Sequence, residues 1–196
     1  MAFCYDIPMT KYILHGGLSI EDNTKNSKFY QEIFKGITLL VTILMVYFAR
    51  ADNKRQELFN IHKKLLVKNN PDQEINFVYA SDDIEEFREQ VKQAQIMFVE
   101  GGSSERLIKH FQQLSDIKEL IQSVAVYVGS SAGASIIAQY AYPSTDDQIQ
   151  ERLGILPIKI INHYDDTKAD RLQKLESMHP ELKTYALVEC EFIVMM

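Results

Sequence analysis

The sequence predicts an α/β protein, a three-layer sandwich with a mostly parallel central sheet. From Tyr12 onward, short apolar runs alternate with amphipathic stretches, the pattern of parallel strands joined by crossover helices. Glycine pairs close two of the predicted strands, Gly16-Gly17 after residues 12–15 and Gly101-Gly102 shortly after residues 96–99. The 196 residues are 46% apolar and 24% charged, so we expect one domain, 1–196, with a full core.

The first half of the chain supplies three predicted strands and three predicted helices. The strands are residues 12–15, a segment within 38–48, and 75–80, and the helices are 27–35, 53–68 and one that starts at Asp82-Asp83. Asn69-Asn70-Pro71 ends the second helix, because two asparagines and a proline break the helical pattern.

The second half continues the alternation. It contains strands 96–99, 124–128 and 158–161, helices 104–114 and 117–122, and a helix-prone run at 134–138. In open parallel sheets, reactive groups collect at the carboxyl ends of the strands. The positions to inspect are therefore Gly16-Gly17, Ala49-Arg50, Ala80-Ser81, Gly101-Gly102, Gly129 to Gly133, and His163.

Charge and composition exclude several classes of protein. The formal net charge of −6 argues against nucleic acid as a partner, since binding phosphate backbones needs clustered Lys and Arg. The longest apolar run, residues 37–48, falls short of the roughly 20 residues of a membrane span. The first residues lack the features of a secretory signal, and Cys4 and Cys190 alone build neither a disulfide framework nor a cysteine metal site. We therefore expect a cytoplasmic protein.

A serine turn carries the strongest chemical signal. Gly129-Ser130-Ser131-Ala132-Gly133 has the form G-x-S-x-G between an apolar strand and a helix-prone run. On such a turn, Ser131 is exposed at the end of the sheet as a nucleophile, and small flanking residues let strand and helix approach. A purely structural glycine-serine turn is the alternative.

Residues Gly129 to Ala134, Gly-Ser-Ser-Ala-Gly-Ala, also resemble the nucleophile motif of peptidase E, the α-aspartyl dipeptidases, and of the related cyanophycinases. The resemblance extends from about Tyr12 to Leu187 and includes Gly101-Gly102 and Asn162-His163-Tyr164. It implies a class I glutamine amidotransferase-like (flavodoxin-like) fold and a serine peptidase acting on small peptides, dipeptides with N-terminal Asp among them.

A serine nucleophile needs a histidine within hydrogen-bond reach, and the chain has five. His62 and His110 fall on predicted helices and His179 lies in a polar stretch, whereas His15 ends the first strand. His163 follows the strand 158–161 and is expected at the same sheet edge as Ser131. It is the predicted base, and His163-Tyr164 is similar to the histidine pair of the peptidase E family.

The third member of a triad is a carboxylate that orients the imidazole. By position alone, Asp146, Asp147, Asp165 and Asp166 all remain open. The resemblance favours Asp146, because Ser144-Thr145-Asp146 is similar to the family's acidic turn, with Asp147 as the register-shifted alternative.

The oxyanion would be stabilised by two backbone N–H groups, those of Gly102 and Ala132.

An Arg would hold an acidic substrate side chain, and Arg106, Arg152 and Arg171 are the candidates. Ser103-Ser104 departs from the Asn-Thr usual in the family. The chemistry requires no metal and no cofactor.

Two function classes remain open at this level. The first is the serine peptidase, and the second is a catalytically inactive amidotransferase-like domain with a binding or regulatory role. A nucleotide site is disfavoured, because neither glycine pair completes a phosphate-binding motif. The apolar end of the chain, 192–196, predicts an edge that could pair with a second subunit as a homodimer.

Overall fold

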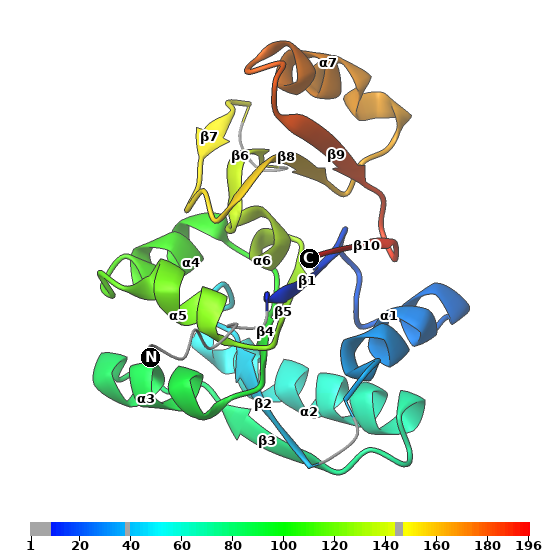
Figure 1. The fold of residues 1–196 in the computed structure, drawn as a ribbon. Coiled ribbons are helices and arrows are strands. Elements are labelled where there is room, and N and C mark those ends of the chain that lie inside the picture. The colour runs from blue at the N-terminus through cyan, green and yellow to red at the C-terminus, as the bar shows by residue number, and fades with distance from the viewer. Residues whose placement is uncertain (1–8, 38–39, 144–146) are drawn as a thin grey trace, which may run out of the picture.

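The computed structural model describes residues 9–37, 40–143 and 147–196, and its larger part is a six-stranded sheet (Figure 1). The strand order is β10-β1-β5-β4-β2-β3. The strands are β1 (Lys11–His15), β2 (Val41–Val46), β3 (Ile75–Tyr79), β4 (Ile96–Val99), β5 (Val126–Ser130) and β10 (Phe192–Met195). Every neighbouring pair is parallel except β10, which runs antiparallel to β1. The carboxyl ends of the five parallel strands therefore meet at one edge.

Helices cover both faces of this sheet, which gives the three layers predicted from the sequence. One face carries α1 (Thr24–Phe34) and α2 (Asp52–Asn69), and the other carries α3 (Ile84–Gln93), α4 (Ser104–Phe111) and α5 (Ile117–Ser123) (Figure 1). Adjacent residues of a strand enter opposite layers of the core: Ile43 packs with the α1 and α2 side and Leu44 with the other. Strands buried on both faces read as continuous apolar runs, which explains the sequence pattern.

A smaller, four-stranded sheet of order β7-β6-β8-β9 follows the serine turn. Its strands are β6 (Ala138–Tyr142), β7 (Gln150–Glu151), β8 (Leu156–Asn162) and β9 (Lys183–Leu187), and α7 (Ala169–Ser177) packs on it after the short 3-10 helix η1 (Asp166–Lys168). The parallel strands β8 and β9 bring Asn162 beside Leu187 at their carboxyl ends. The chain then crosses from β9 back to β10 in the large sheet, so the two sheets meet near the serine turn (Figure 1).

The helix-prone run expected after the serine turn departs from the sequence prediction, and the helix α7 and the strand β9 were not predicted at all. Only α6 (Ala132–Ser135) forms, and Ala138 already begins β6. Ile136 and Ile137 are β-branched, and Tyr140 and Tyr142 follow at the spacing of a strand, so this stretch favours extended structure beyond one turn.

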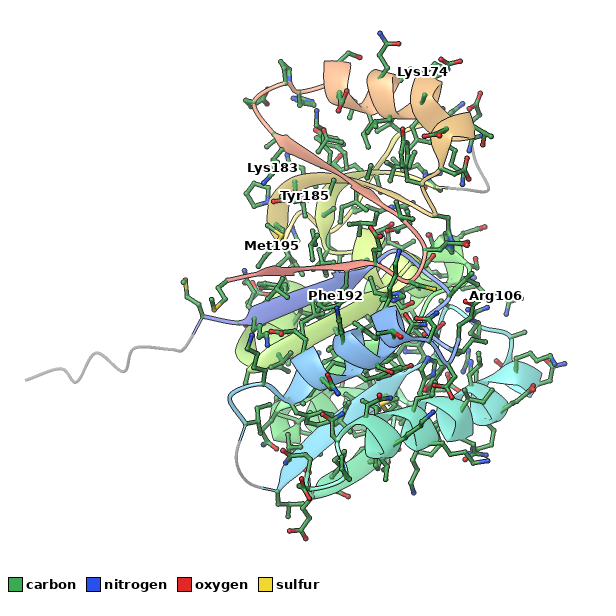
Figure 2. All side chains as sticks on the ribbon, turned by 90° about the vertical axis from the view of Figure 1, so that its right-hand side faces the viewer. Arg106, Lys174, Lys183, Tyr185, Phe192 and Met195 are labelled. Atoms are coloured by element: carbon green, nitrogen blue, oxygen red, sulfur yellow. The ribbon has the colours of Figure 1, made fainter. Side chains whose placement is uncertain are left out.

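The apolar end of the chain forms β10, which lies beside β1, with Phe192 and Met195 at its two ends (Figure 2). Phe192 packs against Phe29 of α1, with ring centroids 5.7 Å apart. Pairing of this edge with a second subunit stays a prediction. In the part of the chain that the structure describes, no helix is both long and apolar enough to cross a bilayer.

Candidate active site

Ser131 sits on a sharp turn between β5 and α6. Its φ of 49° places it in the left-handed region, which is strained for a residue with a side chain. A Cβ added to Gly129 would lie 2.4 Å from the carbonyl oxygen of Gly133, and one added to Gly133 would lie 2.1 Å from that of Val99. The two glycines of the motif therefore let the turn close on itself and against β4, which fixes Ser131 at the sheet edge.

His163 meets Ser131 as the sequence predicts. It directly follows β8, and its Nε2 lies 2.8 Å from the Oγ of Ser131. Its backbone N–H donates to the carbonyl of Gly16, and its own φ is 52°. Two residues that are far apart in the chain are thus both held in strained conformations and in hydrogen-bond contact.

Glu189 completes a serine-histidine-carboxylate arrangement. Its Oε1 lies 2.9 Å from the Nδ1 of His163, while Nε2 of the same ring faces Ser131. Glu189 follows β9 by two residues and precedes Cys190, whose φ is 60°. Glu189 was not among the carboxylates expected from the sequence. The available signal was its position just after a strand, at the edge where His163 also emerges.

The aspartates considered from the sequence lie elsewhere or are not described. Asp146 lies outside the described residues. Asp147 accepts a hydrogen bond from the hydroxyl of Tyr142, which lowers the pKa of the Asp147 carboxyl. Asp165 bonds Lys168 and Thr167, which together hold the pKa of its carboxyl down to about 2. Asp147 and Asp165 are each engaged away from the imidazole.

A small hollow of about 20 Å³ adjoins Ser131 and is lined by both residues predicted to supply oxyanion donors, Gly102 and Ala132. Ala132 is the first residue of α6, where a backbone N–H has no acceptor within the helix. Asn162 also lines the hollow, and its Nδ2 donates to the carbonyl of Ser131 at 2.7 Å. The hollow has room for one small group, such as a carbonyl oxygen.

A second, larger hollow of about 340 Å³ also borders Ser131 and His163, and Arg50 and Glu100 line it. We call it the nucleophile hollow. Arg50 donates to the carboxylate of Glu100 at 3.0 Å, and Glu100 is only 3% exposed. Burial by itself raises the pKa of Glu100, but His62 and Arg50 outweigh it, so that pKa is lowered and the carboxylate stays charged.

Other buried polar groups surround this charge. His62 faces Glu100, Ser19 and Tyr47, with Nε2 3.2 Å from the Glu100 carboxylate. Ser130 donates to Ser19, which in turn donates to Glu100. His62, which lies on α2 as the sequence predicts, therefore belongs to a buried hydrogen-bond network that reaches Ser130, the residue before Ser131.

The three arginines proposed from the sequence lie away from the nucleophile hollow. Arg171 lies 3.5 Å from Asp147 and over the ring of Tyr142, and Arg106 lines a separate hollow with Phe48 and His110. Arg152 is 9% exposed and lines neither hollow beside Ser131. Arg50 instead shares the nucleophile hollow with Ser131, and its position just after the strand predicted within 38–48 had marked it for inspection.

A larger hollow, about 880 Å³, lies elsewhere, over α1 and the turn at 69–73, and none of the residues that line the two hollows beside Ser131 lines it. Size alone therefore does not locate the chemistry. The contact between Ser131 and His163 marks the candidate site, because a nucleophilic serine needs a base within hydrogen-bond reach.

Comparison with known proteins identifies the family and the fold. The model of peptidase family S51 matches residues 22–195. A peptidase from an acI-B1 Actinobacterium superposes with a TM-score of 0.63 at 20% identity, over 95% of this chain and 83% of that one. A putative peptidase E protein from Listeria monocytogenes EGD-e gives 0.63 at 17% identity, over 95% and 98%. Among curated proteins no match was found. The resemblance and the fold class predicted from the sequence are confirmed.

Proposed function

The chain belongs to peptidase family S51 and is a serine-type peptidase, and from this premise we propose that it hydrolyses small peptides through an acyl-enzyme formed on Ser131. Dipeptides with N-terminal Asp are the first candidate substrates. The single observation that carries the proposal is the 2.8 Å contact between Ser131 Oγ and His163 Nε2. It supports a nucleophile paired with its base at the edge of the sheet.

In the proposed mechanism, the Ser131 hydroxyl attacks the scissile carbonyl carbon while Nε2 of His163 accepts its proton. Nε2 must then be the unprotonated nitrogen, and Nδ1–H donates to Glu189. The Glu189 carboxylate orients the ring and stabilises the imidazolium that forms. His163 next protonates the leaving amine, and a water molecule, activated by the same ring, releases the acyl group.

The developing oxyanion would lie in the small hollow beside Ser131. The backbone N–H groups of Gly102 and Ala132 are the proposed donors, and their presence in its lining supports that role. Loss of one such donor typically costs about 100-fold or more in kcat. Because the donors belong to the backbone, side-chain variants test them only indirectly.

The experiment is labelling with a fluorophosphonate probe. We expect the unmodified chain to be labelled at Ser131 and Ser131→Ala to show no labelling. Ser130→Ala is the matched control: it removes a neighbouring buried hydroxyl and should still label. If the folded unmodified chain does not react, the inactive binding domain is the better description.

Substrate preference is tested with a library of dipeptides that vary in the first residue, with release of the free amino acids as the readout. A strong preference for Asp at that position would support aspartyl dipeptidase activity. A flat profile would contradict it and leave the peptidase activity itself unaffected.

A further inference from the structure

A third hollow continues from the nucleophile hollow toward α2. It measures about 490 Å³ and reaches the first three turns of that helix. The two hollows share three lining residues, Ile20, Arg50 and Gly102. They therefore form one groove that starts at Ser131 and ends on α2, and we call its far part the α2 hollow.

The walls of the α2 hollow are largely apolar. Ile20, Leu58 and Ile61 line it together with Ala49 and Ala51. Ile20 is 40% exposed, and Leu58 and Ile61 are only partly buried. An apolar side chain that enters the hollow would leave water and cover these surfaces, which is favourable.

The charges along the groove are balanced. Arg50 is bonded to the buried Glu100, and Lys54 pairs with Glu57 at 3.2 Å. Both basic side chains that line the α2 hollow thus already have a carboxylate partner. A negatively charged group bound there would have to compete with Glu100 and Glu57, whereas a neutral apolar one would not.

We propose that this groove binds an extended peptide substrate and that the α2 hollow takes an apolar side chain two or more residues from the cleaved bond. Continuity with the hollow at Ser131 identifies the substrate as the occupant. Arg50 lies where the two hollows join, and its side chain is 39% exposed. In the proposed complex its guanidinium donates to a backbone carbonyl of the peptide and keeps its bond to Glu100. The inference rests on the proposed peptidase function and extends the proposed substrates from dipeptides to longer peptides.

The experiment uses internally quenched peptides that differ at one position, Leu in one member of each pair and Glu in the other, scanned on both sides of the cleaved bond. We expect kcat/KM to favour Leu by about 10-fold or more at one position, which is typical of an apolar pocket. Leu58→Glu should remove that preference and leave the other positions unchanged.

Val67→Glu is the matched control, because Val67 lies on the same helix, is 47% exposed and lines neither part of the groove. It should keep the preference. Thermal unfolding checks that Leu58→Glu is folded. If it is not, Ile20→Glu, at a more exposed position, replaces it in the same peptide assay.

Fluorophosphonate labelling distinguishes failure of the proposed groove from failure of the proposed peptidase function. An unmodified chain that labels at Ser131 but shows no preference for Leu at any distant position, or retains it in Leu58→Glu, overturns the groove alone. A folded chain that neither labels nor cleaves any peptide overturns the proposed function and the groove with it.

Discussion

Gly17 packs directly against the imidazole of His163. A Cβ added to Gly17 would lie 2.1 Å from Cε1 of the ring and 2.6 Å from Nδ1, the nitrogen that faces Glu189. The φ of Gly17 is 125°, a conformation that residues with side chains rarely adopt. The loop after β1 therefore forms the wall that holds the ring in place.

Gly17→Ala should displace His163 and lower kcat/KM by about 100-fold, because small errors in the position of a catalytic group are that costly. The measurement is peptide hydrolysis together with the rate of fluorophosphonate labelling. Gly154→Ala is the control, since Gly154 also has a positive φ, 64°, but an added Cβ there would meet nothing within 4 Å. Equal losses in both variants would show that backbone strain, and not contact with the ring, is responsible.

Glu189→Gln should lower kcat by about 1,000-fold or more while KM changes little, because an amide neither selects the required tautomer nor stabilises the imidazolium. Asp147→Asn should remain close to the unmodified rate, since Asp147 bonds Tyr142. The readout is steady-state peptide hydrolysis.

Asp146→Asn belongs in the same experiment, because Asp146 is the carboxylate expected from the sequence and lies outside the described residues. With Glu189 as the orienting group, Asp146→Asn retains most activity. The opposite ranking, with Asp146→Asn inactive and Glu189→Gln active, would restore the prediction made from the sequence.

Stability should fall as the pH drops from about 6.5 to about 4 because of His15. Its ring is fully buried, and burial lowers its pKa from 6.5 to about 4. In that window the unfolded chain binds a proton that the folded chain does not, so protonation favours unfolding, by about 3 kcal/mol at the acid end.

Urea unfolding across this pH range measures the effect. His15→Gln should flatten the dependence, whereas His179→Gln, at a more exposed position, should leave the slope as it is. Because Nδ1 of His15 accepts the N–H of Gly17, protonation of His15 should also loosen the loop that holds His163. An unmodified chain whose stability is constant across this range would contradict the prediction.

Glu100→Gln should lower the free energy of unfolding by about 3 kcal/mol, because the Glu100 carboxylate is only 3% exposed and accepts from Arg50 and Ser19 and faces His62, and an amide cannot replace all of these contacts. Glu57→Gln, which breaks the exposed pair with Lys54, should cost less than about 1 kcal/mol. Denaturant unfolding at neutral pH compares the two. Equal effects would show that burial does not govern the strength of the Glu100 pair.

Local patterns in the sequence predicted most of the secondary structure. Strand 96–99 is reproduced as β4, and the helix starting near Asp82-Asp83 begins at Ile84, with Asp83 as its N-cap. The run after Ser131 was predicted wrongly as a longer helix, because Ala and Ser favour the turn of α6 but Ile136, Ile137 and the tyrosines beyond them favour β6. Local propensity does not reveal which neighbour such a mixed segment pairs with.

Local features were enough to predict a tight turn at Ser131 and a histidine, His163, at the end of an apolar strand: small residues surround Ser131, and the run 158–161 precedes the histidine. Only the tertiary structure brought Glu189 to Nδ1 of His163, Gly17 against the ring, and Arg50 to Glu100 beside the nucleophile. Each of these contacts joins loops from different strands. Their distances depend on strand order and on the crossing between the two sheets, which the spacing of residues along the chain does not encode.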